Sequence, residues 1–403
     1  MNFRFAALLL VTFSSSLLFG STSGCRDPLA TNYDSQATIN DGSCLYPLDT
    51  VYPVTAIVLD SLAHETSGLI VWNGSIWTQN DDNDTAIHSL DTISGNVQQT
   101  LPLTGVVNYD WEEISQDDSY IYIGDFGNNS AGNRTDLHVL RVEKNSLING
   151  FPVIDTIAFS YSNQTNFTAS GATDFDCEAM VVSDDSIFLF TKQWVSKQTT
   201  LYGFPKIPGT WIADSLTTYN VSGLITGATY VKDKAIVVLT GYNVSFFPFI
   251  YLLYDFEGTH FLSGNKRRLA TALPYHQTEG VATFDGLNYY ISCEQFYHSP
   301  IFIDAQLMKF DFSQYLSAYI SSLNNIPDEN PPTLFEITHL TKNEIEVIYP
   351  SSFDGKFYSI FDMSGKLIAT GKLQEKSTLI NMTGIAEGNY LFNVDGKTVK
   401  FIR

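Results

Sequence analysis

Short apolar runs separated by polar turns recur along the middle of the chain, between Val54 and Phe312. Each repeat opens just before an apolar position and continues through a strand, a turn, a second strand that ends in polar residues, and two further strands. Runs of this length, punctuated by turn residues, predict β-strands. The repeats open at Ser67-Gly68-Leu69, Glu112-Glu113-Ile114, Glu178-Ala179-Met180, Thr226-Gly227-Ala228 and Glu279-Gly280-Val281.

The second strands follow these openings at a nearly constant offset, which is typical of a repeat architecture. They are Trp77–Asp81, Tyr122–Asp125, Phe188–Lys192, Val237–Tyr242 and Tyr290–Glu294. Five repeats of four strands predict an all-β fold, a five-bladed β-propeller, because propeller blades are four-stranded sheets set around a central channel.

The fifth repeat contains only three strands of its own. We expect Val54–Leu59 to supply its outer strand, which would close the ring without a long free edge. A β-sandwich is one alternative, and a six-bladed ring is another if Ile148–Asp174 contains a further blade. The pattern favours five blades, because Ile157–Tyr161 predicts a single outer strand and Asn163–Thr173 a polar loop.

The first residues predict export. Arg4 precedes the apolar run Phe5–Val11, and small residues follow up to Gly24, as in a secretory signal peptide (residues 1–24) that is too short to span a membrane. No other apolar run approaches the length of a transmembrane segment, and Phe246–Leu253 predicts a buried strand.

The next segment, residues 25–48, is rich in turn residues and is bracketed by Cys25 and Cys44. It resembles a short module common in exported Bacteroidetes proteins. Export to an oxidising space makes a Cys25–Cys44 disulfide the expected state. An acylated Cys25 is the alternative, although Thr22 stands where such a site usually carries Leu. Cys177 and Cys293 are expected to be buried thiols, since nothing nearby has zinc-ligand spacing.

Near the other end, the polar, proline-rich residues 324–332 predict a linker between domains. The strands beyond it surround an Asp362-Met363-Ser364-Gly365-Lys366 turn and a Gly384–Tyr390 segment, and they end in Lys400–Arg403. Residues 333–403 resemble the type A sorting domain of type IX secretion cargo. The resemblance implies a small β-sandwich after the propeller (52–323), delivery by the type IX secretion machinery, and a secreted or outer cell-surface location.

The net charge of −21 is uneven along the chain. From Thr333 onward there are eight Lys/Arg and eight Asp/Glu, so the whole acidic excess lies before the sorting domain. An acidic body disfavours nucleic acid and anionic membranes, whose binding depends on basic patches. It is compatible with cation binding and equally with simple solubility.

The first strand of each propeller blade lines the central channel, so the residues that open the repeats should form one ring. That ring is Ser67, Glu112, Glu178, Thr226 and Glu279. Three carboxylates in a narrow channel repel one another, and one must hold a proton unless a cation lies among them. Ligands made only of oxygen favour Ca²⁺ over zinc or copper. The alternative is that each Glu caps its own blade through backbone amides.

Three motifs carry a second resemblance. Glu65–Leu69, Asp110–Ile114 and Glu279–Ala282 are similar to motifs of bacterial propellers classed as esterase-like phytase relatives, and the ring order resembles that of calcium-activated apyrases. The resemblance implies a five-bladed fold with calcium on the axis. Two positions depart from it: Glu113 replaces the usual glycine, and Thr226 stands where the apyrases carry serine.

The channel mouth is predicted to gather most titratable groups on one face, where an extracellular ligand would bind. That ligand face comprises Asp81, Asp110, Asp125, Arg134, Lys192, Tyr242 and Glu294. His64 and His276 each lie three residues before a repeat opening, on blades that adjoin at ring closure, and are the candidate catalytic residues. Loop histidines without any special role are the alternative.

Three functions remain open from the sequence. The favoured one is an exported, calcium-holding binding or interaction module. The second is a calcium-dependent hydrolase of phosphoesters or phosphoanhydrides, in which His64 or His276 moves protons. The third is a carbohydrate-active propeller that uses two of Glu112, Glu178 and Glu279. The scarcity of Lys and Arg on the ligand face counts against phosphate binding, and no nucleophile elbow, P-loop or zinc motif occurs.

Overall fold

The computed structural model describes residues 21–324, 335–349, 353–363, 366–374, 377–394 and 397–403. The predicted signal peptide up to residue 20 and the predicted linker from residue 325 lie outside the described residues. The chain divides into two compact units, Met1–Ile320 and Ser321–Arg403. Within the described ranges, no helix is long and apolar enough to cross a membrane.

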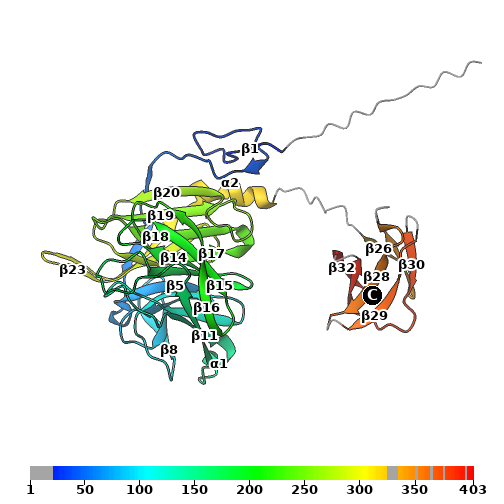
Figure 1. Ribbon diagram of the computed structural model, residues 1–403, viewed down its shortest axis with the longest axis horizontal. Helices are drawn as coiled ribbons and strands as arrows, with labels where there is room; N and C mark the ends of the chain where they lie inside the picture. Colours follow the sequence, from blue (N-terminus) through cyan, green and yellow to red (C-terminus); the bar gives the residue numbers. More distant parts are fainter. Residues whose placement is uncertain (1–20, 325–334, 350–352, 364–365, 375–376, 395–396) are drawn as a thin grey trace, which may run out of the picture. The chain divides into compact units, whose positions relative to one another are not determined.

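The first unit is built from antiparallel sheets, as expected for an all-β protein (Figure 1). The first two sheets are β5 (Thr66–Trp72), β6 (Ser75–Asn80), β7 (Ala86–Leu90) and β8 (Val97–Pro102), then β9 (Trp111–Gln116), β10 (Tyr120–Asp125), β11 (His138–Glu143) and β12 (Ile154–Tyr161). The next two are β13 (Asp176–Val182), β14 (Ser186–Lys192), β15 (Thr199–Pro205) and β16 (Gly209–Tyr219), then β17 (Leu224–Val231), β18 (Ile236–Tyr242), β19 (Pro248–Tyr254) and β20 (Asn265–Thr271). The last is β21 (Thr278–Thr283), β22 (Asn288–Cys293), β25 (Gln306–Asp311) and β4 (Thr55–Val58).

The first strands of these sheets contact one another in a closed cycle. β5 packs beside β9, β9 beside β13, β13 beside β17, β17 beside β21, and β21 beside β5 again. The fold is therefore propeller-like, with the first strands on the inside. As expected, β4 completes the last sheet: it pairs antiparallel with β25, and Val58 lies opposite Gln306.

Two strand pairings go beyond the predicted repeat. β12 pairs in parallel with the beginning of β16, which joins the second and third sheets along their outer edges into one continuous eight-stranded sheet. β3 (Asp49–Val51) pairs in parallel with β20 and so adds a fifth strand to the fourth sheet. Both pairings cover backbone groups that an outer strand would otherwise leave exposed.

The hydrophobic core lies between neighbouring sheets. Ile157, Val182 and Phe204 belong to one cluster between the second and third sheets, and Val181, Leu239 and Phe261 belong to the next. Each such side chain contributes about 1.5–3 kcal/mol when buried, so the sheets stabilise one another in series around the ring. The helix α2 (Ser313–Asn324) packs Tyr315 and Leu316 into the cluster between the fourth and fifth sheets.

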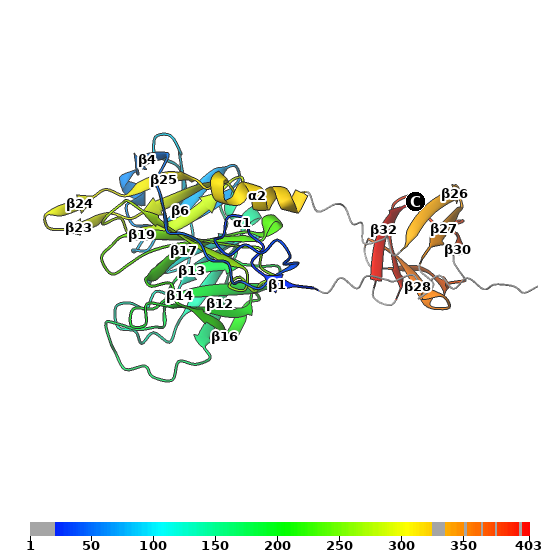
Figure 2. The same ribbon diagram turned by 90° about the horizontal axis from the view of Figure 1, so that it is seen from above.

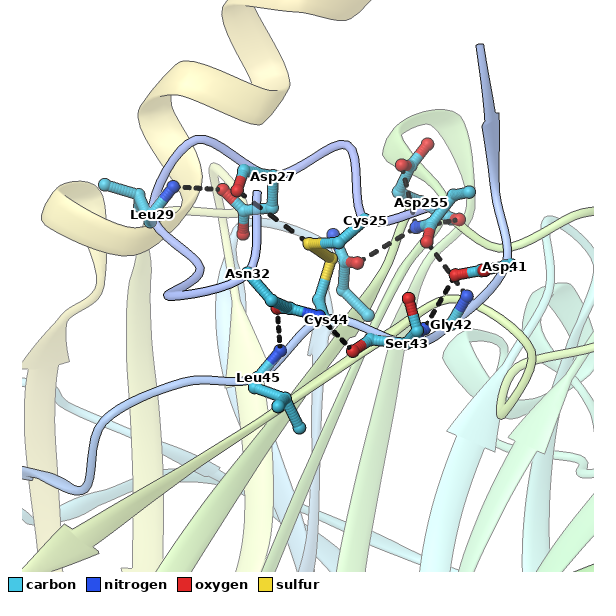
Figure 3. The surroundings of a disulfide bond; sticks show 12 residues. Cys25, Asp27, Leu29, Asn32, Asp41, Gly42, Ser43, Cys44, Leu45 and Asp255 are labelled. Carbon is cyan, nitrogen blue, oxygen red and sulfur yellow. Dashed lines mark hydrogen bonds between the residues drawn. A yellow bond between two sulfur atoms is a disulfide. The ribbon is translucent and has the colours of Figure 1, made fainter. Parts of the chain in front are cut away.

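The predicted disulfide is confirmed: Cys25 and Cys44 are bonded, with their Cα atoms 4.7 Å apart. The module that they bracket includes β2 (Ile39–Asn40), which pairs in parallel with β1 (Ser23–Gly24) just before Cys25, and it lies against the fourth sheet (Figure 3). Asn40 Nδ2 donates to Asp255 Oδ2 and to Asn265 Oδ1, both at 2.9 Å. Cys177 and Cys293 are buried free thiols, as expected.

The remaining short elements described in the first unit are the helical turns η1 (Ser61–Ala63), α1 (Lys144–Ile148) and η2 (Lys232–Lys234), and a hairpin of β23 (Phe296–His298) and β24 (Ile301–Ile303). The hairpin projects from the sheets in both views (Figures 1 and 2).

The second unit contains two antiparallel sheets that share one core. The sheets are β26 (Glu336–Thr341), β27 (Glu344–Ile348) and β30 (Ser377–Asn381), and β29 (Leu367–Lys372), β28 (Phe357–Asp362), β31 (Asn389–Val394) and β32 (Lys397–Ile402). Val347 and Ile380 from the first sheet meet Ile360 and Phe392 from the second. This unit therefore has a hydrophobic core of its own.

Candidate functional site

A β-bulge marks the same place in every inner strand. Ser67, Glu112 and Thr226 are the extra residues where the pairing register shifts, and the shifts in β13 and β21 contain Glu178 and Glu279. A bulged residue is left out of the ladder and its side chain is re-aimed, which is why bulges are common beside functional sites. The five bulges occupy equivalent positions, so each predicted ring residue has the same place in its inner strand.

Four of the five ring residues line one cavity of about 260 Å³. We call it the axial cavity. Its lining is Ser67, Asp81, Asp110, Glu112, Asn129, Glu178, Lys192, Trp194, Tyr242, Gln277, Glu279 and Glu294. Thr226 is not part of this lining among the described residues; it is fully buried, and its hydroxyl donates to the backbone carbonyl of Thr278. The Ser67 hydroxyl also donates to a backbone carbonyl of the next inner strand, that of Glu112, at 2.6 Å.

Five of the seven residues predicted for the ligand face line the axial cavity, and two do not. Asp81, Asp110, Lys192, Tyr242 and Glu294 line the axial cavity. Asp125 and Arg134 are outside its described lining, and they pair with each other through Oδ1 and Nη2 at 2.7 Å. That pair sits beside the cavity as a structural ion pair, since the Asp125 side chain is fully buried.

His64 and His276 also lie outside the described lining of the axial cavity. His64 Nδ1 bonds to the carbonyl of Ser61 at 2.9 Å, and its Nε2 is 3.6 Å from Glu65 Oε1. His276 Nδ1 bonds to the carbonyl of Pro274 at 3.0 Å. Both rings are thus fixed by local backbone contacts.

Carboxylates crowd the cavity more closely than the ring alone predicts. The ligand oxygens of Glu112, Asp176 and Glu178 lie within 4.8 Å of one another, and those of Glu65, Asp81 and Glu294 form a second such group. A Cβ at Gly127 would lie 2.3 Å from an oxygen of Asp110 and 2.3 Å from an oxygen of Glu112. Only glycine there leaves room for two carboxylates side by side.

Lys192 supplies the single ammonium group among the described residues that line the axial cavity. The lysine is buried, with 3% of its surface exposed, and its Nζ pairs with Glu178 Oε2. The ammonium also lies 5.0 Å from the ring centre of Trp194 and 5.2 Å from that of Tyr242, within cation–π range. One positive charge therefore faces six carboxylates in the lining.

Burial and mutual repulsion raise the pKa of these carboxyl groups. Burial, then the neighbouring Glu65, raises the pKa of Asp81 to about 7, and burial, then Asp176, raises that of Asp110 to about 6. Burial, then Asp81, raises the pKa of Glu294 to about 8. Burial, then Glu178, holds the pKa values of Glu112 and Glu279 well above the usual range. Glu279 Oε2 is buried and has no hydrogen-bond partner. Such a cavity must hold protons or take up a cation.

Sequence reasoning missed several residues of this site, notably Asp176, Glu65 and Gln277. A signal for them was present. Side chains two apart in a strand lie on the same face, and the residue two before a repeat opening is polar in four repeats of the five: Glu65, Asp110, Asp176 and Gln277.

The closed cycle of inner strands and the carboxylate-rich cavity that they line make this an all-β protein with a propeller-like fold. No family model matches the chain, and no curated protein matches it. Among solved structures, the chain is similar to PorZ, a surface component of the type IX secretion system of Porphyromonas gingivalis, at 13% identity and a TM-score of 0.31, covering 84% of this chain and 44% of PorZ. The chain thus spans less than half the length of PorZ.

Two further likenesses are to proteins of other kinds. The WD40 repeats of RRP9 match at 8% identity and a TM-score of 0.38, covering 66% of this chain and 100% of that one. A putative oxidoreductase (glucose dehydrogenase) of Thermus thermophilus matches at 9% identity and a TM-score of 0.37, covering 64% of this chain and 99% of that one. At these TM-scores none of the likenesses carries an argument about function, and the fold rests on the sheets themselves.

Proposed function

We propose that residues 52–323 form a five-bladed β-propeller that holds one Ca²⁺ ion in the axial cavity and acts outside the cell as a binding or interaction module. The closed cycle of inner strands supports five blades, because each of the five sheets contributes its first strand to it. Glu112, Asp176 and Glu178, whose oxygens lie within 4.8 Å of one another, are the first candidate ligands, with Glu279 and Ser67 beside them.

The observation that carries the proposal is the charge imbalance of the cavity. Six carboxylates line about 260 Å³ and meet one ammonium group. Ca²⁺ takes six to eight oxygen ligands, including carboxylates and waters, and neither sulfur nor imidazole belongs to the described lining. The donor set therefore suits calcium better than zinc or copper.

A calcium-dependent hydrolase is the less favoured function. Its proposed acid–base residues, His64 and His276, are not among the described residues that line the cavity. Among the described residues of that lining, Lys192 is the only positive charge that could meet a phosphate, and it is already paired with Glu178. A site of this kind binds cations more readily than anions.

Thermal melting of the full-length protein tests the metal. We expect a calcium concentration 100 to 1,000 times the dissociation constant to stabilise the protein by about 3 to 4 kcal/mol relative to chelator, because the ion binds the folded ring alone. Glu112→Gln removes one charged ligand and should reduce the calcium-dependent shift, whereas Glu257→Gln, at an exposed position, should leave it unchanged. Identical melting in calcium and chelator, with no metal found by elemental analysis, would contradict the proposal.

We also propose that residues 333–403 act as a β-sandwich sorting domain for type IX secretion. The two sheets around one core support a separate small domain, and the resemblance of its motifs supports the sorting role. Mass spectrometry of the culture and cell-surface fractions should find a mature protein that begins near Cys25 and lacks the region after residue 332. Full-length protein that stays in the cytoplasm would refute the export proposal and leave the calcium proposal untouched.

A further inference from the structure

Directly after the ring residues, the inner strands carry a second layer of positions. Four of its five members are small: Gly68, Ala179, Gly227 and Gly280. The member from the second sheet is Glu113, which is fully buried. Glu113 is thus the one long side chain in a layer whose other members are glycine or alanine.

Close packing explains the small residues. A Cβ at Gly227 would lie 1.7 Å from the backbone oxygen of Glu279, and a Cβ at Gly280 would lie 2.6 Å from the side chain of Leu69. Neighbouring inner strands therefore touch through their backbones. A Cβ at Gly68 would lie 2.4 Å from Glu113 Oε1, so the Glu113 carboxylate occupies the room that the missing side chains leave.

The carboxylate of Glu113 is held by backbone amides of several sheets. Its Oε1 accepts from the N–H of Ile114 at 3.0 Å, and its Oε2 accepts from the N–H of Ala228, on the inner strand of the fourth sheet, at 2.8 Å. Burial holds the pKa of Glu113 well above its usual range, although hydrogen bonds from backbone amides, that of Ala228 first, act in the opposite direction. Converging backbone N–H groups form concave sites for anions.

We propose that the amides of Ile114 and Ala228 form a carboxyl-binding site inside the ring, which the chain fills with its own Glu113. The side chain crosses from β9 to β17 and so links the inner strands of the second and fourth sheets. This inference does not depend on calcium, since it concerns hydrogen bonds that no metal contacts.

Chemical rescue tests the carboxyl-binding site in the full-length protein. Glu113→Gly introduces the residue found in three other sheets and empties the site, so the melting temperature should fall by at least about 5 °C. Sodium formate should recover several degrees of that loss in the variant and give no shift in the parent protein. A bulky sulfonate buffer at the same sodium concentration controls for ionic strength. If Glu113→Gly melts like the parent, or if formate shifts both proteins equally, the proposal is wrong.

Glu113→Gln is the matched variant, because it fills the same space but turns an N–H₂ group toward an N–H donor. It should melt at a lower temperature without responding to formate. If Glu113→Gly fails to fold, the proposal is tested by measuring amide hydrogen exchange in Glu113→Gln. The amide of Ala228 should exchange at least about tenfold faster than in the parent, while amides of β19 stay unchanged; equal protection at Ala228 overturns the proposal.

Discussion

Lys192 determines how the axial cavity balances its charge. Its ammonium lies among the carboxylates, pairs with Glu178 and is flanked by Trp194 and Tyr242. A side chain fixed in this way acts as a tethered cation. If calcium uses Glu178, it must share that carboxylate with Lys192 or displace the ammonium, and the affinity for calcium is lowered accordingly.

Lys192→Met should therefore tighten calcium binding while making the fold more dependent on the ion. We expect about a tenfold lower dissociation constant by calorimetric titration, which corresponds to about 1.4 kcal/mol. In chelator the same variant should lose about 3 to 5 kcal/mol of stability, because removal of one partner leaves the other charge buried and unpaired.

Lys232→Met is the control, since Lys232 forms an exposed ion pair with Asp184. It should change neither the affinity nor the stability by more than about 1 kcal/mol. An unchanged or weaker affinity in Lys192→Met would show that the ammonium supports the metal site rather than competing with it.

At the residue scale, repetition predicted which side chains would converge, but not what each would bond to. Ser67, Glu112, Glu178 and Glu279 line one cavity because equivalent positions in successive sheets carry them. Thr226 is outside the described lining; it is fully buried, and its hydroxyl donates to the carbonyl of Thr278. The Lys192–Glu178 pair was not predictable, since it depends on side-chain directions that a repeat pattern does not contain.

At the scale of elements, hydrophobic patterning located the strands and even the closure of the last sheet by β4. It did not locate the bulges. A bulge depends on the register of two strands, and the alternation of one strand carries no information about it. The bulges nevertheless give the site its geometry, because they re-aim the ring residues.

The packing of the disulfide module against the fourth sheet was likewise not predictable from hydrophobic patterning. Asp27 Oδ2 accepts from the hydroxyl of Tyr46 at 2.7 Å and also from that of Tyr254, in the fourth sheet. The guanidinium of Arg267 lies over the rings of Tyr46 and Tyr315, at 4.9 and 4.3 Å. The Asp27–Tyr254 and Arg267–Tyr46 contacts join residues more than two hundred positions apart. The strand β3 has only three residues and is too short to show a hydrophobic pattern. The cysteines predicted the crosslink but could not predict the docking surface.

At the scale of the whole molecule, the distribution of net charge and the hydrophobic cores both separate the chain into an earlier and a later part. The acidic excess belongs entirely to the part before Thr333, and the last part is balanced. Each compact unit has a hydrophobic core of its own. Stability that depends on cation binding should therefore be confined to the first unit.

Differential scanning calorimetry of the full-length protein should accordingly show two transitions. Calcium should raise the midpoint of the transition that belongs to the first unit, because an ion that binds one folded domain stabilises that domain by mass action and contributes nothing to another. The second transition should stay within about 1 °C, since its carboxylates are matched by an equal number of Lys and Arg residues. Glu112→Gln should reduce the calcium shift of the first transition without moving the second. A single transition that calcium shifts as a whole would mean that the two cores unfold cooperatively, and a shift of the second transition alone would place the cation site in the wrong domain.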